Sequence, residues 1–193
     1  MLDYLKRLWL KFVVRYSDPQ KYFNNRWRLD IHTDRWNSDL TKRYYEIIEE
    51  LMKSNQCENF LDIGCGAWAT LRDLPNYLGL DFSIEALMKS GLGEFIFADI
   101  TKRIPLPSKS YDMVFTRSVL LHIPPHKIAE AVQEISRIGK KCIVLDEPEF
   151  EEGKKFQAHN FNHNLKELFK DFDGKVIFLR HLLADTIDSM NKT

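Results

Sequence analysis

Cysteine is scarce in this sequence, and long apolar runs are missing. Only three of the 193 residues are cysteine, and no two of them form a CxxC pair. This argues against a disulfide framework and against a structural zinc site. No apolar run approaches the roughly 18–20 residues that span a bilayer. Basic residues interrupt the first segment, so it does not read as a secretory signal. We therefore expect a cytoplasmic protein.

An excess of charge of either sign is also missing. Lysine plus arginine and aspartate plus glutamate both number 28, which gives a formal net charge of zero. Proteins that bind nucleic-acid backbones usually carry a basic excess, so nucleic acid is not an expected partner. Hydrophobic residues make up 44% of the chain, which is ordinary for a globular protein and sufficient for one core.

Hydrophobic periodicity divides the chain into two parts of a single compact domain. Residues 1–55 are expected to form an N-terminal helical cap or lid, with helices at 1–16 and near 44–51 and an irregular stretch over 17–40. Residues 56–193 alternate strands with helices, the clearest helix covering 125–138. The expected strands are 60–63, 77–80, 94–98, 112–116, 141–145 and 175–182. This order predicts an α/β fold with a doubly wound, mostly parallel sheet of six or seven strands, Rossmann-like, with helices on both faces.

Glycines and carboxylates follow the first three of these strands. Ligands of such a sheet bind beyond the carboxyl ends of its strands. Gly64 and Gly66 lie after the first strand, where glycine lets the backbone approach a ligand closely. Asp81 ends the second strand and could accept hydrogen bonds from both hydroxyls of a ribose. Asp99 after the third strand could accept from an adenine amino group, with Ile100 packed on the ring.

Four motifs in this order resemble the class I methyltransferases that use S-adenosylmethionine (SAM), in the group that modifies small molecules. They are Leu61-Asp-Ile-Gly-Cys-Gly66, Gly79-Leu-Asp81-Phe-Ser83, Ala98-Asp99, and the 105–122 segment with Ser110-Tyr-Asp-Met-Val114. The resemblance covers about residues 58–147. It implies an enzyme that transfers a methyl group from SAM to a small-molecule acceptor and releases S-adenosylhomocysteine (SAH). The family's sheet usually has seven strands, the last antiparallel.

The resemblance also implies a set of cofactor-binding residues, all close to strand ends. They are Asp62, Gly64, Cys65, Gly66, Asp81, Phe82, Asp99, Ile100, Thr116, Arg117 and Ser118. The first four and the last three would surround the methionine part, and the others would hold the adenosine. Two features depart from the family pattern. Trp68 occupies the position of a common third glycine, and no convincing seventh strand follows residue 182.

Two other interpretations of the glycine loop stay open. Residues 64–69 also fit the dinucleotide-binding pattern GxGxx[G/A], in which Asp81 would serve a nicotinamide cofactor. The loop could also be a relic that binds nothing. Asp62 at the strand end, the Ala98-Asp99 pair and the missing second nucleotide-binding half favour SAM.

His122 follows the fourth strand, near the place where the methyl group should emerge. A neutral imidazole there could take the proton of an acceptor hydroxyl, which favours methylation at oxygen. The alternative is a histidine that only shapes the pocket. Candidate acceptor-binding residues are Tyr22, Trp27, Trp68, Asp146 and Glu147.

Further alternatives concern partners. The acidic run after the fifth strand is typical of a solvated loop, and we expect no bound metal ion. Residues 1–16 combine an apolar and a basic face, so peripheral membrane contact and a lipid acceptor are one alternative. A methyltransferase-like module that binds without catalysis is another. No feature of the sequence specifies an oligomeric state.

Overall fold

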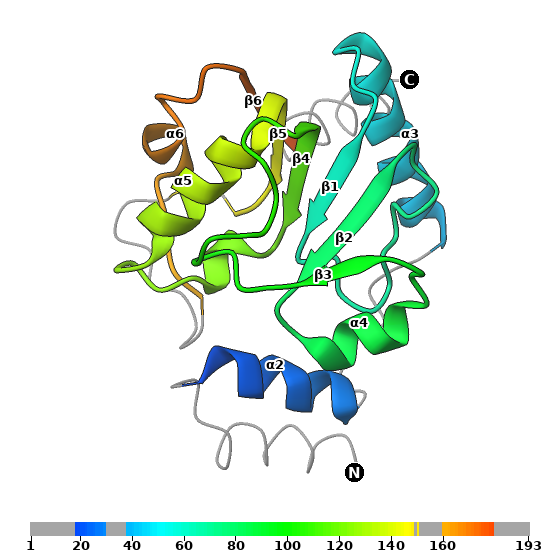
Figure 1. Ribbon diagram of the computed structural model, residues 1–193, viewed down its shortest axis with the longest axis vertical. Helices are drawn as coiled ribbons and strands as arrows, with labels where there is room; N and C mark the ends of the chain where they lie inside the picture. The colour runs from blue at the N-terminus through cyan, green and yellow to red at the C-terminus, as the bar shows by residue number, and fades with distance from the viewer. Residues whose placement is uncertain (1–17, 30–37, 149, 151–159, 180–193) are drawn as a thin grey trace, which may run out of the picture.

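Six parallel strands form the centre of the molecule (Figure 1). The computed structural model describes residues 18–29, 38–148, 150 and 160–179. The strand order is β3-β2-β1-β4-β5-β6, and every neighbouring pair is parallel. The strands are β1 (Phe60–Ile63), β2 (Tyr77–Asp81), β3 (Phe95–Phe97), β4 (Tyr111–Arg117), β5 (Gly139–Asp146) and β6 (Lys175–Phe178). The predicted doubly wound sheet is confirmed.

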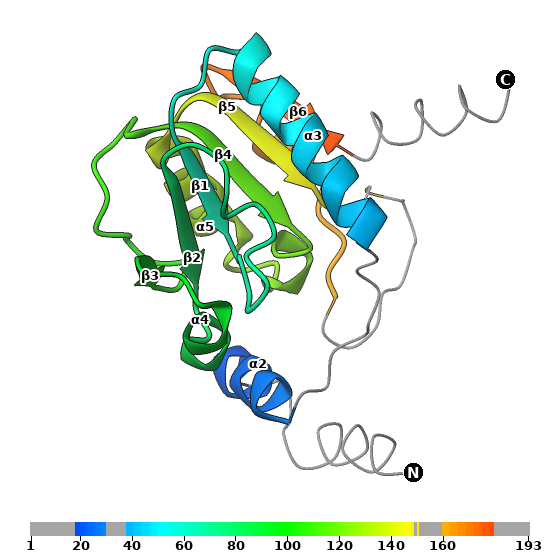
Figure 2. The same ribbon diagram turned by 90° about the vertical axis from the view of Figure 1, so that its right-hand side faces the viewer.

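Helices lie on both faces of this sheet (Figure 2). The helices of the described residues are α2 (Pro19–Arg28), α3 (Ser38–Ser54), α4 (Ile84–Ser90), the 3-10 helix η1 (Leu120–His122), α5 (Ile128–Ile138) and α6 (Leu165–Leu168). α3 covers one face and α5 the other, whereas α4 packs against β2 and β3. No helix among the described residues is both long and apolar enough to cross a membrane.

The core consists of two apolar clusters, one on each face of the sheet. All four residues of β1 are buried, as expected for a strand with helices on both sides. Side chains alternate between the faces: Leu61 joins the cluster under α5, and Phe60 joins the cluster under α3. Ile48 from α3 completes the second cluster. Residues 1–55 were expected to form a cap. α3 belongs to this segment, yet it packs against the sheet as part of the core.

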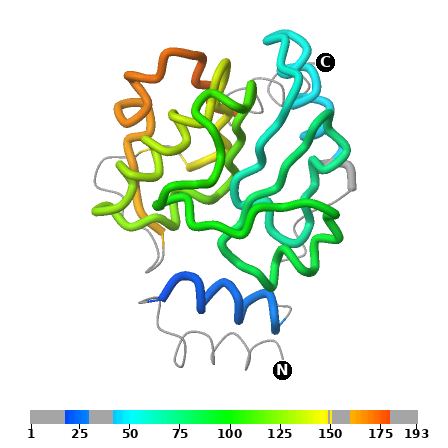
Figure 3. The backbone as a smooth tube through the Cα atoms, in the orientation of Figure 1, coloured from blue at the N-terminus to red at the C-terminus, as the bar shows by residue number. Residues whose placement is uncertain are grey.

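The prediction of an irregular stretch over residues 17–40 was wrong for its first part. Pro19–Arg28 forms α2, and the side chain of Asp18 caps the helix by accepting a hydrogen bond from the Lys21 N–H at 3.0 Å. Asp at the N-cap followed by Pro at the first helical position is a strong start signal. α2 runs beyond the end of the sheet beside α4 (Figure 3). The predicted helix at residues 1–16 lies outside the described residues.

The helix predicted over residues 125–138 begins three residues later, at Ile128. The Lys127 N–H donates to the Pro124 carbonyl at 2.9 Å, so the chain forms a turn before the helix. The helix ends as predicted at Ile138, where Gly139 is the C-cap and also starts β5 in an extended conformation. This early turn keeps residues 124–127 at the carboxyl end of the sheet.

Candidate functional site

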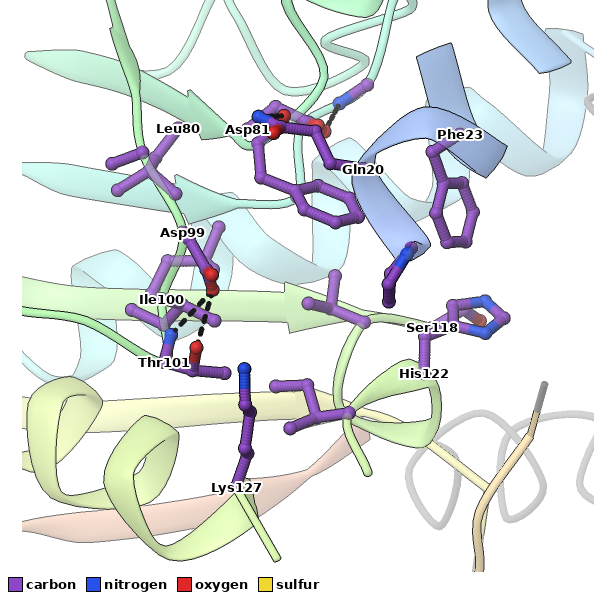
Figure 4. A pocket seen from close by; sticks show the side chains of 18 of the residues that line it. Gln20, Phe23, Leu80, Asp81, Asp99, Ile100, Thr101, Ser118, His122 and Lys127 are labelled. Carbon is purple, nitrogen blue, oxygen red and sulfur yellow. Dashed lines mark hydrogen bonds between the residues drawn. The ribbon is translucent and has the colours of Figure 1, made fainter. Parts of the chain in front are cut away.

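A cavity of about 750 Å³ lies beyond the carboxyl ends of β1, β2, β3 and β4 (Figure 4). Segments after these four strands form its floor and sides, and α2 contributes a further wall. The predicted site residues that line it are Trp27, Gly64, Gly66, Trp68, Asp81, Phe82, Asp99, Ile100, Arg117, Ser118 and His122. The fold thus brings together residues from four strand ends that are far apart in the sequence.

The two glycines of the loop after β1 have backbone conformations that favour glycine. Gly64 has φ +73° and Gly66 has φ +62°. A Cβ atom on Gly64 would overlap the side chain of Val119. A Cβ atom on Gly66 would lie 3.2 Å from the Trp27 ring, so the α2 wall closes directly over this loop. The loop backbone borders the cavity, and its two glycines leave room for the Val119 and Trp27 side chains to pack against it.

Asp81 joins the glycine loop to the start of α4. One carboxylate oxygen accepts from the Gly66 N–H at 2.9 Å, and the other accepts from the Ser83 N–H at 2.8 Å. The side chain is buried, and this burial raises its pKa to about 6. An ionised carboxylate has about four acceptor positions, so two remain beyond the backbone bonds. Asp81 borders the cavity and has acceptor capacity for two further donors.

Asp99 borders the same cavity after β3, the strand next to β2 (Figure 4). Its Oδ1 accepts from the backbone N–H of Thr101 at 3.0 Å and from the Thr101 hydroxyl at 2.8 Å. Its Oδ2 is 4.0 Å from Lys102 Nζ. Ile100 beside it is buried and also borders the cavity. This pair offers one carboxylate edge and one apolar surface, the combination that an aminopurine ring requires.

Six predicted site residues do not line the cavity: Tyr22, Asp62, Cys65, Thr116, Asp146 and Glu147. Asp62 is buried behind the glycine loop, where its carboxylate accepts from the Tyr77 hydroxyl at 2.8 Å and burial raises its pKa to about 6. Asp146 accepts from the Tyr44 hydroxyl at 2.7 Å. Asp62 and Asp146 therefore do not line the cavity, and each accepts a hydrogen bond from a tyrosine hydroxyl behind it.

Glu147 supports the segment that carries His122. Its Oε1 accepts from the N–H groups of Val119 at 2.8 Å and Leu120 at 3.2 Å, and its Oε2 accepts from Leu121 at 3.4 Å. These are the orphan donors at the start of η1, where a carboxylate is favourable. Burial nevertheless raises its pKa to about 7. Glu147, at the end of β5, thus fixes the turn that follows β4.

The three buried carboxyls predict a pH dependence of stability. Asp62, Asp81 and Glu147 have pKa values raised to about 6, 6 and 7. The folded protein holds these protons more tightly than the unfolded chain. Their stabilising contribution is complete below about pH 4 and is lost as the pH rises through about 6 to 7. Asp112 and Glu134 have lowered pKa values, so these two carboxylates stabilise the folded protein when ionised. Their contribution is lost only as the pH falls through the acidic range in which they become protonated.

We expect the free energy of unfolding to fall between about pH 4 and about pH 7, with each proton contributing a slope of at most about 1.4 kcal/mol per pH unit. Glu147→Gln keeps an acceptor for η1 but cannot titrate, so its slope should be shallower. Urea unfolding at several pH values measures both slopes. Equal slopes in the variant and the parent protein would contradict the raised pKa of Glu147.

His122 is the last residue of η1 and packs against α2. Ser118, at the end of β4, has φ +54° and donates its N–H to the Asp146 carbonyl at 3.1 Å, which turns the chain away from the sheet. The imidazole then packs against the Phe23 ring, with the centroids 5.0 Å apart and the planes at 64° (Figure 4). The histidine borders the cavity at its junction with α2.

α2 contributes cavity residues that the sequence analysis did not identify, chiefly Phe23 and Gln20. Phe23 contacts the Phe82 ring at 5.4 Å, and the Gln20 amide donates to the Phe82 carbonyl at 2.9 Å. Trp27 meets Trp68 edge-on at 5.7 Å. The helix start at residues 18–19 could have revealed this wall, because Phe23 and Trp27 are spaced i,i+4 and share one helix face.

Comparison with known proteins agrees with this arrangement. Residues 61–142 match the family described as methyltransferase domain. The fold is similar to magnesium protoporphyrin IX methyltransferase (ChlM) from Synechocystis PCC 6803 with bound SAM: the TM-score is 0.56 and the identity 15%, over 81% of this chain and 84% of that one. It is also similar to DesVI from Streptomyces venezuelae, with a TM-score of 0.50 and 18% identity, over 60% of this chain and 54% of that one. The strand-end motifs, the sheet order and the match of residues 61–142 to the methyltransferase domain all agree with the fold of a class I SAM-dependent methyltransferase.

Proposed function

We propose that this enzyme methylates an oxygen atom of a small-molecule acceptor, with His122 as the general base. The observation that carries the proposal is the position of the imidazole, which borders the same cavity as the glycine loop and Asp81. A neutral imidazole can accept a proton from a hydroxyl. The name of ChlM, a structural neighbour, states a small-molecule acceptor, magnesium protoporphyrin IX.

In this proposal the cofactor extends along the strand ends. Asp81 would accept from the ribose hydroxyls, and Asp99 with Ile100 would hold the adenine. Gly64 and Gly66 would let the backbone approach the methionine part, and Arg117 and Ser118 would border it from β4. SAM supplies an electrophilic methyl group attached to a sulfonium. The support is that all these residues border one cavity, in the order in which their strands lie in the sheet.

The acceptor would bind between His122 and the α2 wall. Phe23 and Trp27 of α2, with Trp68 and Phe161 facing the same cavity, supply apolar surface. Such walls favour an acceptor with an apolar or aromatic body and one reactive hydroxyl, because a few placed polar groups then fix its orientation. α2 would also exclude water from the reacting atoms, which strengthens the electrostatic interactions there. The role of His122 is to take the hydroxyl proton at its ring nitrogen.

The test uses the full chain, SAM with an isotope-labelled methyl group, and pools of phenols, carboxylic acids, alcohols and amines. SAH formation reports turnover, and NMR of the labelled methyl carbon identifies the atom that it joins. The expected result is turnover with hydroxyl-bearing acceptors and a methyl resonance typical of carbon bonded to oxygen. Turnover confined to amines, or a methyl group on carbon, would overturn the assignment to oxygen and leave the methyltransferase identity intact.

A further inference from the structure

Two of the three cysteines lie side by side at the end of the sheet opposite the cavity. Cys57 is located just before β1, and Cys142 is near the start of β5. Their sulfur atoms are 3.6 Å apart, although 85 positions separate them in the sequence. A disulfide bond is about 2.05 Å long, so the two sulfurs need to approach by about 1.5 Å. The third cysteine, Cys65, is in the glycine loop at the other end of the sheet.

The two thiols differ in exposure and in acidity. Cys57 is half-buried, whereas Cys142 is fully buried. The hydrogen bond between the two thiols lowers the pKa of Cys57 despite the opposing effects of burial and of the Asp112 carboxylate, and the Lys141 ammonium group lowers it further. The same bond and burial raise the pKa of Cys142. A partly exposed, more acidic thiol beside a fully buried one is the arrangement of a nucleophilic cysteine and its resolving partner.

A metal-binding role does not fit this pair. Zinc and related ions in proteins require three or four ligands from His, Cys, Asp or Glu. Within the described ranges, no group of three or more such side chains is arranged to hold a metal ion. The close contact of the two sulfurs is therefore better explained by a reaction between the two thiols than by metal binding.

We propose that Cys57 and Cys142 form a reversible disulfide when the protein meets a peroxide. The Cys57 thiolate attacks one peroxide oxygen: an S–O bond forms, the O–O bond breaks, and the departing hydroxide takes up a proton. The Cys142 sulfur then attacks the Cys57 sulfenic acid, so that an S–S bond forms, the S–O bond breaks and water leaves. Two thiols lose two electrons, and hydrogen peroxide is reduced to two molecules of water.

The disulfide would tie the segment before β1 to β5, which lies two strands away in the sheet. It would close a loop of 85 positions, and a cross-link over so long a loop stabilises the folded state mainly by restricting the unfolded chain. The pair is at the amino ends of the strands, whereas the cavity is at their carboxyl ends. Oxidation should therefore raise the melting temperature and leave the affinity for SAH unchanged. This inference does not depend on the proposed acceptor.

The test treats the reduced full-length protein with hydrogen peroxide and follows its intact mass. We expect the loss of two hydrogen atoms, a linked peptide pair containing Cys57 and Cys142, a higher melting temperature, and full reversal by a dithiol reductant. Cys65→Ser should still form the link, whereas Cys57→Ser and Cys142→Ser should not. Either single variant that remains folded is sufficient for the comparison.

Three outcomes would overturn the proposal. One is an intact mass that is unchanged at peroxide concentrations that oxidise a free thiol. Another is accumulation of oxygen adducts on Cys57 without a cross-link, which would show that Cys142 does not resolve the sulfenic acid. The last is a cross-link that includes Cys65, which would show that the protein rearranges before it is oxidised.

Discussion

Asp81→Asn is expected to weaken the binding of both SAM and SAH by at least about 100-fold. In the proposed complex the ionised carboxylate accepts from two ribose hydroxyls, and hydrogen bonds to charged groups contribute about 1.5–3 kcal/mol each. Loss of both corresponds to about 3 kcal/mol or more, and each 1.4 kcal/mol is about a factor of ten in affinity. Calorimetric titration of the folded variant with SAH measures the effect without turnover.

Asp81 also accepts from Gly66 and Ser83, so its replacement will lower stability as well as affinity. Asp112→Asn is a matched control. Asp112 is a buried aspartate of the same sheet that accepts from the Glu58 N–H at 3.0 Å, but it lies at the amino end of β4. This variant should lose stability and keep its affinity for SAH. If Asp81→Asn bound SAH as tightly as the parent protein, the ribose assignment would be wrong.

His122→Ala is expected to lower kcat by about 100- to 10,000-fold, the usual contribution of a positioned general base. SAM affinity should change little, because the cofactor contacts proposed for Asp81, Asp99 and the glycine loop stay in place. Steady-state assays with one hydroxyl acceptor measure kcat, and calorimetric titration with SAH measures the affinity.

Chemical rescue separates a base from a residue that only shapes the pocket. Added imidazole should restore part of the activity of His122→Ala, because the small base can enter the space that the side chain leaves. Glu147→Gln is a useful companion, since Glu147 contacts the backbone of η1 rather than the cavity. It should change kcat far less than His122→Ala. An alanine variant with the parent rate would remove the general base from the mechanism.

The sheet could be predicted from the sequence because its strands are buried on both faces and therefore appear as continuous apolar segments. The position of Gly64, Asp81 and Asp99 around one cavity followed from topology, since the carboxyl ends of parallel strands meet at one edge. α2 was missed because its aromatic and charged residues resemble those of a loop, and it has no buried residue to give a strong periodic signal. The N-cap Asp18 followed by Pro19 indicates the start of this helix better than hydrophobic periodicity does.

Roles that depend on tertiary partners could not be predicted. Glu147 was expected to contact the acceptor, yet its partners are backbone N–H groups more than 25 positions earlier in the chain. No residue pattern encodes such a contact, because every residue except proline offers the same N–H group. The approach of Cys57 to Cys142 was equally hidden. An odd number of widely spaced cysteines gives no pairing signal.

The contacts that hold α2 on the rest of the structure determine how freely its residues can be substituted. None of its side chains is buried, and its contacts with the rest of the described structure are ring edges, hydrogen bonds and an ion pair between Arg28 and Glu85. Exposed ion pairs of this kind add little to stability. Changes on this helix therefore reshape one side of the pocket without disturbing the core that folds the protein. If the acceptor binds beside α2 as proposed, its preference can diverge here while the residues proposed to bind SAM stay the same.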